Sequence, residues 1–369
     1  MQTQQLVPLA LPRGQKLFCE LCRGPATLRC GSCAVTYYCD VEHQSADWVS
    51  IHEKICQLLI PLRTTLPFYN SEEERKHGRE QKLRREKFLA ELTQAVAQNF
   101  LLEGKHEDAI PAALHSLKFS ISVHSSNAVE LVPAYLILAE AGLGLGHLIQ
   151  AEEYLSQAQW IILKNSHCSN AIQSDFHRNL GLLHAAKGNF EDSLYHLAND
   201  IYFSSCAFGT NHMAASGGYF HMANVFFRQN RMDIADSLYT EVTNIWHHHF
   251  SHFIGLQYHT LMTPAELDML AEEEETTEEV LDAKQRAEAK QMLSAILEIR
   301  EQSPRPQLAQ IAKVLHTLAM FHYLILDVPK AHELVMKLLQ VMKKLPKYEP
   351  SESLHQLVKL LKSKPIYAK

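Results

Sequence analysis

The stretch KGNFEDS, residues 187–193, has the composition of a tight turn between two helices. Its Gly188 suits the left-handed backbone conformation in which many helices end. Related turns begin at Gly104, Gly146 and Asn230, so the four turns follow one another at a regular interval of 42 residues. A fixed interval of this length is the signature of a repeat architecture. We therefore expect four repeats, each made of two antiparallel helices.

Small residues recur at fixed positions around these turns. One set lies five residues after the turn residues, at Ala109, Ala151, Ser193 and Ala235, and another lies seven residues before them, at Ala97, Ala139, Gly181 and Ala223. Small side chains that face each other let two helices approach closely, while apolar neighbours fill the groove between them. The pattern resembles tetratricopeptide repeats, and the 42-residue interval is similar to that of kinesin light chains.

This resemblance implies an α-solenoid, in which stacked helix pairs form a concave surface lined by the first helix of each pair. Such a surface binds proteins. The register makes six residues candidates for partner binding: Arg178, Asn179, Phe220, Asn224, Phe227 and Arg228. Phe220 and Phe227 are equally compatible with the core of the solenoid, because large aromatic side chains are often buried.

The cysteines form a second pattern, because six of the eight lie between residues 19 and 56. In a reducing compartment such clustering indicates metal binding rather than disulfides. With two histidines they supply eight donors, enough for two tetrahedral zinc sites: Cys19, Cys22, Cys30, Cys33, Cys39, His43, His52 and Cys56. So short a segment has little core of its own, and each structural zinc would add ~10–16 kcal/mol of folding free energy.

The same segment resembles a MYND-type zinc finger, in its two C-x2-C pairs, in the dipeptide Tyr38-Cys39 and in Gln44 and Trp48. His43 stands where the family usually has a cysteine, and imidazole is an equally good zinc ligand. The interleaved ligation of the family implies one zinc on Cys19, Cys22, Cys39 and His43, and a second on Cys30, Cys33, His52 and Cys56. Four protein ligands per ion imply structural rather than catalytic zinc.

MYND fingers bind short proline-containing peptides, and the resemblance maps that groove onto Gln44 and Trp48. Trp48 is equally compatible with a core aromatic of the small domain. Asp47 departs from the family pattern, which often has a histidine there, and it is not at a ligand position. We expect the finger and the repeats to have separate cores, so that loss of the finger leaves the repeats folded.

Five segments follow from these patterns, and together they predict a mainly α-helical chain. They are a finger over 17–58, a charged linker or helix over 59–87, four repeats over 88–253, a helical segment with an acidic insert over 254–307, and a degenerate terminal repeat with a basic tail over 308–369. The acidic run 272–279 is interpreted as a solvated loop or helix end. Four histidines at 247, 248, 249 and 252 are interpreted as a polar helix end.

Composition and missing motifs argue against several classes of function. The chain has 369 residues with a formal net charge of −6, which argues against a dedicated nucleic-acid-binding protein. No apolar run is long enough to span a membrane, and the first residues lack the features of a signal peptide, so we expect an intracellular protein without membrane partners. The motifs of nucleotide-binding loops, serine hydrolases and zinc proteases are absent, and we expect neither an enzyme nor a small-molecule substrate.

The order of a MYND finger and 42-residue repeats resembles MYND-domain proteins of motile cilia and sperm flagella. This resemblance implies a non-enzymatic scaffold or adaptor in the cytoplasm or cytoskeleton, bound to axonemal tetratricopeptide-repeat or dynein-arm proteins. One alternative is a transcriptional co-regulator that binds proline-containing peptides through the finger. Another is a relative of the SET-and-MYND lysine methyltransferases, although only 18 residues precede Cys19 and the SET signature is missing.

Overall fold

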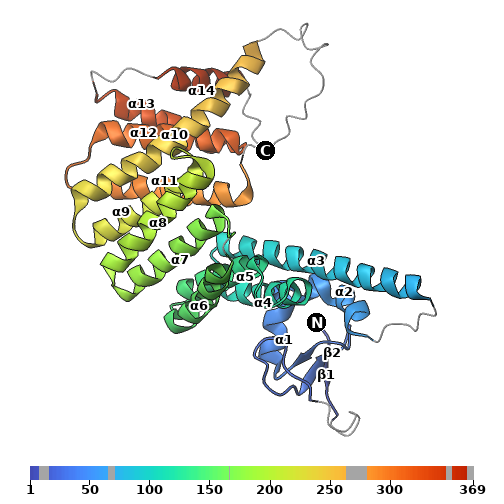
Figure 1. Cartoon of the computed structure of the whole chain (residues 1–369). Coiled ribbons are helices and arrows are strands. Elements are labelled where there is room, and N and C mark those ends of the chain that lie inside the picture. The colour runs from blue at the N-terminus through green and yellow to red at the C-terminus, as the bar shows by residue number, and fades with distance from the viewer. Residues whose placement is uncertain (8–15, 65–70, 166, 263–280, 346–350, 364–369) are drawn as a thin grey trace. The chain divides into compact units, whose positions relative to one another are not determined.

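The computed structural model describes residues 1–7, 16–64, 71–165, 167–262, 281–345 and 351–363 (Figure 1). These residues are mainly α-helical, as predicted, with one small sheet. The chain divides into two compact units, Met1–Asn189 and Phe190–Lys369, and each is described by itself. The acidic run 272–279 and the end of the basic tail lie outside the described residues. None of the described helices has the length and apolar character needed to cross a membrane.

The first unit contains the sheet and the first helices. Its elements are β1 (Thr3–Gln5), β2 (Leu28–Cys30), β3 (Tyr37–Tyr38), α1 (Val41–Asp47), the π-helical turn η2 (Trp48–His52), α2 (Glu53–Arg63), α3 (Glu72–Leu102), α4 (His106–His124), the 3-10 turn η3 (Val129–Leu131), α5 (Val132–Gly144), α6 (Leu148–Lys164) and α7 (Asn170–Lys187). Strand β2 lies between β1 and β3, and both pairings are antiparallel.

The second unit contains only helices among its described residues. They are α8 (Phe190–Phe208), α9 (Met213–Arg228), α10 (Met232–Met262), α11 (Ala283–Gln302), α12 (Leu308–Leu324), α13 (Val328–Met342) and α14 (Glu352–Ser363). The long α10 continues past residue 253, where the fourth repeat was expected to end. The four histidines assigned to a polar helix end lie inside α10, so that interpretation is wrong.

The predicted turns are confirmed. Gly104, Gly146, Gly188 and Asn230 all have left-handed backbone conformations, with φ between 61° and 81°, and each lies between two helices. A fifth turn of this kind is found at Leu326, with φ 65°, between α12 and α13. This turn joins the degenerate terminal pair of helices that the sequence predicts after residue 308.

The small residues around the turns lie where the helices of a pair meet. Within the two units, Ala97, Ala109, Ala139, Ala151, Ala223 and Ala235 are all fully buried. In the α5–α6 pair, a methyl group built on Gly142 would lie 3.4 Å from the Cβ of Ala151. Larger side chains at these positions would force the paired helices apart, which explains the strict small-residue pattern.

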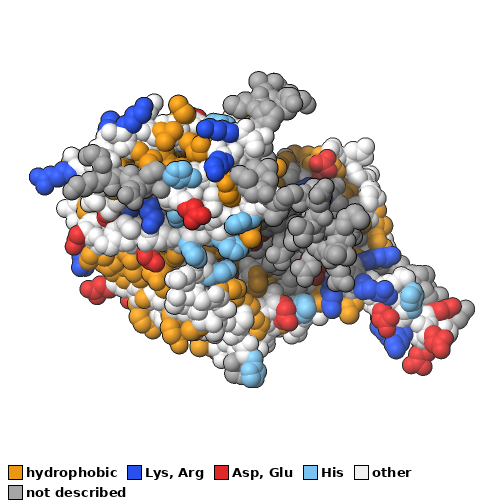
Figure 2. Space-filling view, turned by 90° about the horizontal axis from the view of Figure 1, so that it is seen from above, with side chains coloured by type: hydrophobic (Ala, Val, Ile, Leu, Met, Phe, Trp, Pro, Cys, Tyr) orange, Lys and Arg blue, Asp and Glu red, His pale blue; other side chains and the backbone are white. Residues whose placement is uncertain are grey.

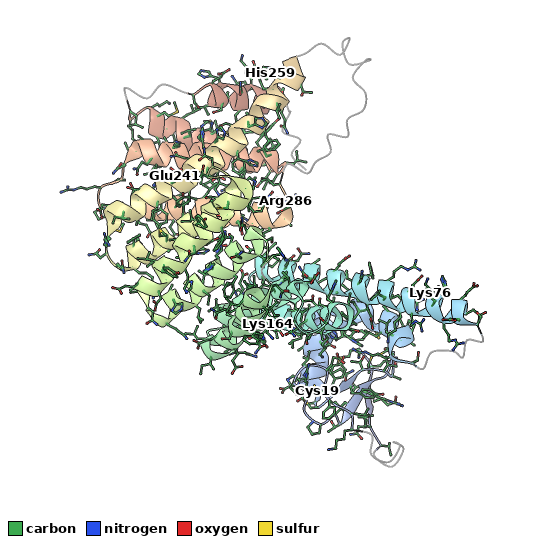
Figure 3. All side chains as sticks on the ribbon, viewed as in Figure 1. Cys19, Lys76, Lys164, Glu241, His259 and Arg286 are labelled. Atoms are coloured by element: carbon green, nitrogen blue, oxygen red, sulfur yellow. The ribbon has the colours of Figure 1, made fainter. Side chains whose placement is uncertain are left out.

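The first half of α3 is a charged and mostly exposed helix. Ser71 begins it with a capping box, because its side chain accepts a hydrogen bond from the Glu74 N–H and the Glu74 carboxylate accepts one from the Ser71 N–H. Acidic and basic side chains are intermixed at this projecting end, at the right of Figure 2. Lys76 marks the same end in Figure 3. Mixed charge of this kind fits a solvated helix better than a nucleic-acid-binding surface.

The structure differs from the expectation of separate cores. Ile51 and Ile55 belong to the second half of the finger and Leu59 follows it, and all three share one hydrophobic cluster with residues of α3, α4 and α5. Leu89 of α3 and Ala112 of α4 belong to this cluster and are also buried. The finger therefore packs as part of the first unit, because its own cluster around Tyr38 is small.

Candidate metal centre

The first group of ligands is brought together by a turn, a strand end and a helix start. Cys19 and Cys22 flank a turn that is closed by a hydrogen bond of 2.7 Å from the Cys19 N–H to the Gly24 carbonyl. Cys39 follows β3, and His43 lies in the first turn of α1. That helix begins where the Asp40 carboxylate accepts a hydrogen bond of 2.7 Å from the His43 N–H.

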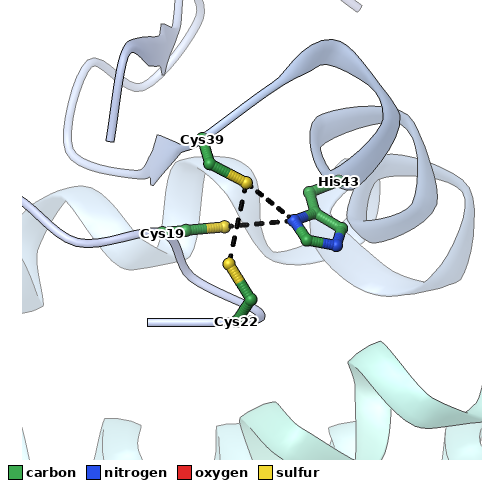
Figure 4. Close-up of side chains that lie close together, drawn as sticks. All are labelled: Cys19, Cys22, Cys39 and His43. Carbon is green, nitrogen blue, oxygen red and sulfur yellow. Dashed lines mark hydrogen bonds between the residues drawn. The ribbon is translucent and has the colours of Figure 1, made fainter. Parts of the chain in front are cut away.

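The four donor atoms of this group converge (Figure 4). The Nδ1 of His43 lies 2.9 Å from the Cys39 sulfur and 3.6 Å from the Cys19 sulfur, and the sulfurs of Cys22 and Cys39 are 3.6 Å apart. Tetrahedral Zn–S and Zn–N bonds of roughly 2.3 and 2.0 Å separate neighbouring donors by roughly 3.5–3.8 Å. The two distances of 3.6 Å lie in this range and the distance between Cys39 and His43 is shorter, so the donor set fits a Cys3His zinc site, with His43 binding through Nδ1.

The second group is buried. The sulfurs of Cys30 and Cys56 are 3.9 Å apart, and the sulfur of Cys33 lies 3.7 Å from the Nε2 of His52. All four ligands are buried, whereas Cys22 of the first group is exposed. In each group the donor atoms lie within 4.8 Å of one another. Two structural Cys3His zinc sites, as predicted, fit these donor sets.

The pKa values of the thiols differ within each group, because some are lowered by hydrogen bonds and others are raised by burial and neighbouring thiolates. Burial opposes ionisation of Cys19, but hydrogen bonds from the backbone of Cys22 and Cys39 outweigh it and lower the pKa of Cys19 to about 7. In the second group, burial and the charges of Cys33 and Cys30 raise the pKa of Cys56 to about 12. Three thiolates cannot ionise side by side without a positive ion, so zinc binding releases protons from these groups.

Asp47 supports the second group without being a ligand. It is fully buried, and its carboxylate accepts hydrogen bonds of 2.6 Å from the Tyr38 hydroxyl and 2.9 Å from the Nε2 of His115. The Nδ1 of His52 lies 3.5 Å from the same carboxylate, on the ring side opposite the Nε2 donor atom. A carboxylate in this position fixes the orientation of a zinc-binding imidazole. Burial would raise the pKa of Asp47, but the His115 ring outweighs it and lowers that pKa.

A second carboxylate, which is largely but not fully buried, joins the finger to α4. Both oxygens of Glu20 accept from the Arg63 guanidinium, at 2.9 and 3.0 Å, and Oε1 lies 2.9 Å from the Lys118 ammonium. Lys118 and His115 both belong to α4, and the His115 Nδ1 lies 3.7 Å from Glu20. His115 therefore lies between two finger carboxylates. Neither Asp47 nor His115 was identified as a site residue from the sequence.

A further contact comes from η2. The Ser50 hydroxyl donates a hydrogen bond of 2.6 Å to the Asp108 carbonyl and accepts one of 3.1 Å from the Ala112 N–H. Both partners are on α4. These bonds and the shared core fix the finger against the first helix pair. A serine in this position has no recognisable signal in the sequence.

The predicted peptide-binding residues of the finger are less accessible than expected. Gln44 is fully buried, and its side-chain amide donates a hydrogen bond of 3.0 Å to the Gln2 carbonyl. Trp48 is half-buried, packs against the finger cluster and lies 5.7 Å from the His52 ring. Gln44 thus faces a segment of this chain, and peptide binding at Trp48 stays a prediction.

Some candidate groove residues of the repeats are also buried, as Gln44 is in the finger. Asn179 of α7 is buried and donates a hydrogen bond of 3.0 Å to the Asp175 carbonyl of its own helix, and Arg178 beside it is half-buried. Phe220 of α9 is buried against the Tyr239 ring. Asn179 therefore does not line an open groove, and for Phe220 the core alternative fits, because both side chains belong to the interior of their units.

The last three candidates lie near the end of α9. Phe227 is 42% exposed, so it is not a core residue. Arg228 stacks over the Phe190 ring, with 5.1 Å from its guanidinium carbon to the ring centre. Asn224 is half-buried and accepts a hydrogen bond of 2.7 Å from the Tyr239 hydroxyl. Of the six candidates, Phe227 offers the largest open apolar surface for a partner.

Residues 19–56 match the family model of the MYND finger. Solved structures similar to the chain include a Podosopora anserina protein of the kinesin light chain type with nearly identical TPR-like repeats, at 13% identity and a TM-score of 0.33, covering 70% of this chain and 99% of that one. Another is BtubC (BKLC) from P. vanneervenii, at 14% identity and a TM-score of 0.31, covering 71% of this chain and 94% of that one.

Proposed function

We propose that this chain is a non-enzymatic scaffold that binds other proteins through its helix pairs and its MYND finger. The proposal rests on one observation: in both metal groups, protein side chains supply all four ligands. Each has four protein donors, so a zinc ion in either has no position open for water or substrate. Zinc in such sites supplies folding free energy and no reaction chemistry, which leaves protein surfaces as the functional part of the chain.

Exposed apolar side chains on single helices support binding of proteins. On α6, Ile149, Trp160 and Leu163 are 77%, 54% and 75% exposed, and their spacing places them on one face of the helix. On α8, Tyr195 and Tyr202 are separated by seven residues and are 66% and 62% exposed. Large apolar and aromatic side chains of this exposure are typical of surfaces that contact other proteins.

The partners we propose are axonemal tetratricopeptide-repeat or dynein-arm proteins of motile cilia and sperm flagella. The support is the resemblance in the order of finger and repeats. Proximity labelling from the tagged chain in multiciliated cells tests it. We expect dynein-arm and axonemal repeat proteins among the labelled set. A set dominated by chromatin regulators would instead favour a co-regulator that acts through the finger, and specific binding of S-adenosylmethionine would favour a methyltransferase relative.

Two matched variants assign the binding surface. Phe227→Ala removes the 42% exposed aromatic group near the end of α9, and Phe88→Ala removes a 55% exposed one from α3. Both side chains are exposed, so neither substitution removes a buried core residue. We expect Phe227→Ala to reduce labelling of the main partners and Phe88→Ala to leave it unchanged. Equal labelling by both variants would exclude this end of α9 as the binding surface.

A further inference from the structure

Residues 1–7 contribute a strand to the finger, which the sequence did not predict. β1 pairs with β2 in the register Thr3–Cys30, Gln4–Arg29 and Gln5–Leu28. The ladder extends beyond β1, because the Gly31 N–H donates to the Gln2 carbonyl and the Leu6 N–H donates to the Thr27 carbonyl, both at 2.9 Å. All three residues of β1 are exposed. The strand is therefore held by its backbone and buries little side-chain surface.

Two finger residues are fitted to this strand. Gln44, fully buried, donates its side-chain amide to the Gln2 carbonyl at 3.0 Å. Gly31 lies so close to Gln2 that a Cβ built on it would be 3.0 Å from the Gln2 Cβ, so a larger residue would require the strand to shift by a few tenths of an ångström. A third contact is made by side chains, since the Arg29 Nε donates to the Gln4 Oε1 at 2.9 Å.

We propose that the edge of β2, together with Gln44 and Arg29, is a docking site for an extended peptide, and that residues 1–7 fill it within the same chain. This inference rests on the proposed function and deepens it for the finger. Addition of a strand to a free sheet edge binds a peptide mainly through its backbone, so one segment can replace another. A partner peptide must displace residues 1–7 before it binds.

The contacts also specify the peptide. Backbone pairing requires an extended segment with N–H groups at the positions of the ladder, which excludes proline where Leu6 now donates. The Arg29 side chain, which now donates to the neutral Gln4, would form a stronger, charge-assisted hydrogen bond with a carboxylate. We therefore expect the partner to present a glutamate opposite Arg29, which lets it compete with the neutral strand of the chain itself.

A binding assay with purified, zinc-loaded protein tests this proposal. The probe is a fluorescent synthetic peptide with the sequence of residues 1–7, and it is titrated into the full chain and into a chain that lacks these residues. We expect the shortened chain to bind the peptide saturably. The full chain should bind it at least about tenfold more weakly, because its own strand competes at a high effective concentration.

Peptide variants make the assay specific. A Leu6→Pro peptide loses the N–H that bonds to Thr27 and should not bind, whereas a Leu6→Ala peptide should bind nearly as well as the parent. A Gln4→Glu peptide should bind more tightly than the parent, by roughly two- to fivefold, as expected for an exposed ion pair. Equal binding by the full and shortened chains, or no binding to a shortened chain that retains both zinc ions, would overturn the proposal.

A second measurement uses the full chain only. Gln44→Ala removes the side-chain bond to Gln2, so the amides of residues 3–6 should exchange hydrogen for deuterium faster than in the parent chain. Unchanged exchange would count against the role of Gln44. The two proposals are tested independently. A negative exchange or peptide-binding result would not affect the labelling test of the scaffold proposal. A negative labelling result would not affect peptide binding by the purified protein.

Discussion

Replacing Asp47 by asparagine tests how far the finger and the first helix pair depend on each other. The substitution keeps the size of the side chain and removes its charge. Asp47 faces three groups: the Tyr38 hydroxyl at 2.6 Å, His115 Nε2 at 2.9 Å and His52 Nδ1 at 3.5 Å. An asparagine has one acceptor oxygen, so its NH2 group must face at least one of these donors.

The size of the effect follows from the burial of this site. A buried donor left without an acceptor costs roughly 1–3 kcal/mol, and breaking a buried charged pair costs roughly 3–5 kcal/mol. Asp47 is fully buried, so we take the upper range for the first unit. For a unit of this size, each kcal/mol corresponds to roughly 2–4 °C, which gives a fall in melting temperature of roughly 6–20 °C.

The assay follows two signals in the full chain during heating: helical circular dichroism and zinc release to a chromogenic chelator. The matched control is Asp40→Asn, because Asp40 is exposed beside the other zinc site and an asparagine still caps α1. We expect Asp47→Asn to lower together the midpoint temperatures of helix loss and of zinc release. Asp40→Asn should change neither midpoint by more than about 2 °C. If zinc leaves Asp47→Asn while the helical signal stays unchanged, the coupling argued from His115 is refuted.

Three further changes test other parts of the structure. Ala235→Trp should destabilise the second unit by at least about 1–3 kcal/mol through overpacking, measured by urea unfolding, whereas the exposed control Ser237→Trp should not. Burial lowers the pKa of His316 to about 3 and that of His247 to about 4, so the folded state favours neutral rings. The free energy of unfolding should therefore fall as the pH drops from about 6.5 towards 4. Equal urea midpoints at pH 7.5 and pH 5 would contradict this. Leu326→Gly should relieve the left-handed strain at φ 65° and raise stability by about 1 kcal/mol in the same assay.

Features encoded within a few residues could be predicted from the sequence. The four turn residues were identified because glycine and asparagine tolerate the left-handed conformation that each turn requires. The zinc ligands were identified because C-x2-C pairs and the i, i+4 spacing of Cys39 and His43 are local geometry. The partition of the ligands between two ions came from the family resemblance, and the structure groups them in the same way.

Features that depend on distant contacts could not be predicted. His115 lies 68 residues from Asp47, and no local pattern distinguishes it from the other histidines of the chain. Residues 3–5 read TQQ, in which only Thr3 is of the β-branched or aromatic type typical of strands, so β1 gave no clear signal. Phe220 and Phe227 lie on one helix and share a residue type, yet the first is buried by Tyr239 and the second is exposed.

The two zinc sites differ in their exposure to solvent, and the buried one connects the finger to the helices of the first unit. The first site is partly open to solvent, because Cys22 is exposed and Cys39 and His43 are half-buried. The second is fully buried, and Asp47 and His115 connect it to α4. An ion can therefore exchange at the first site through local opening, whereas exchange at the second requires the shared core to open. Zinc at the second site thus stabilises the first helix pair as well as the finger.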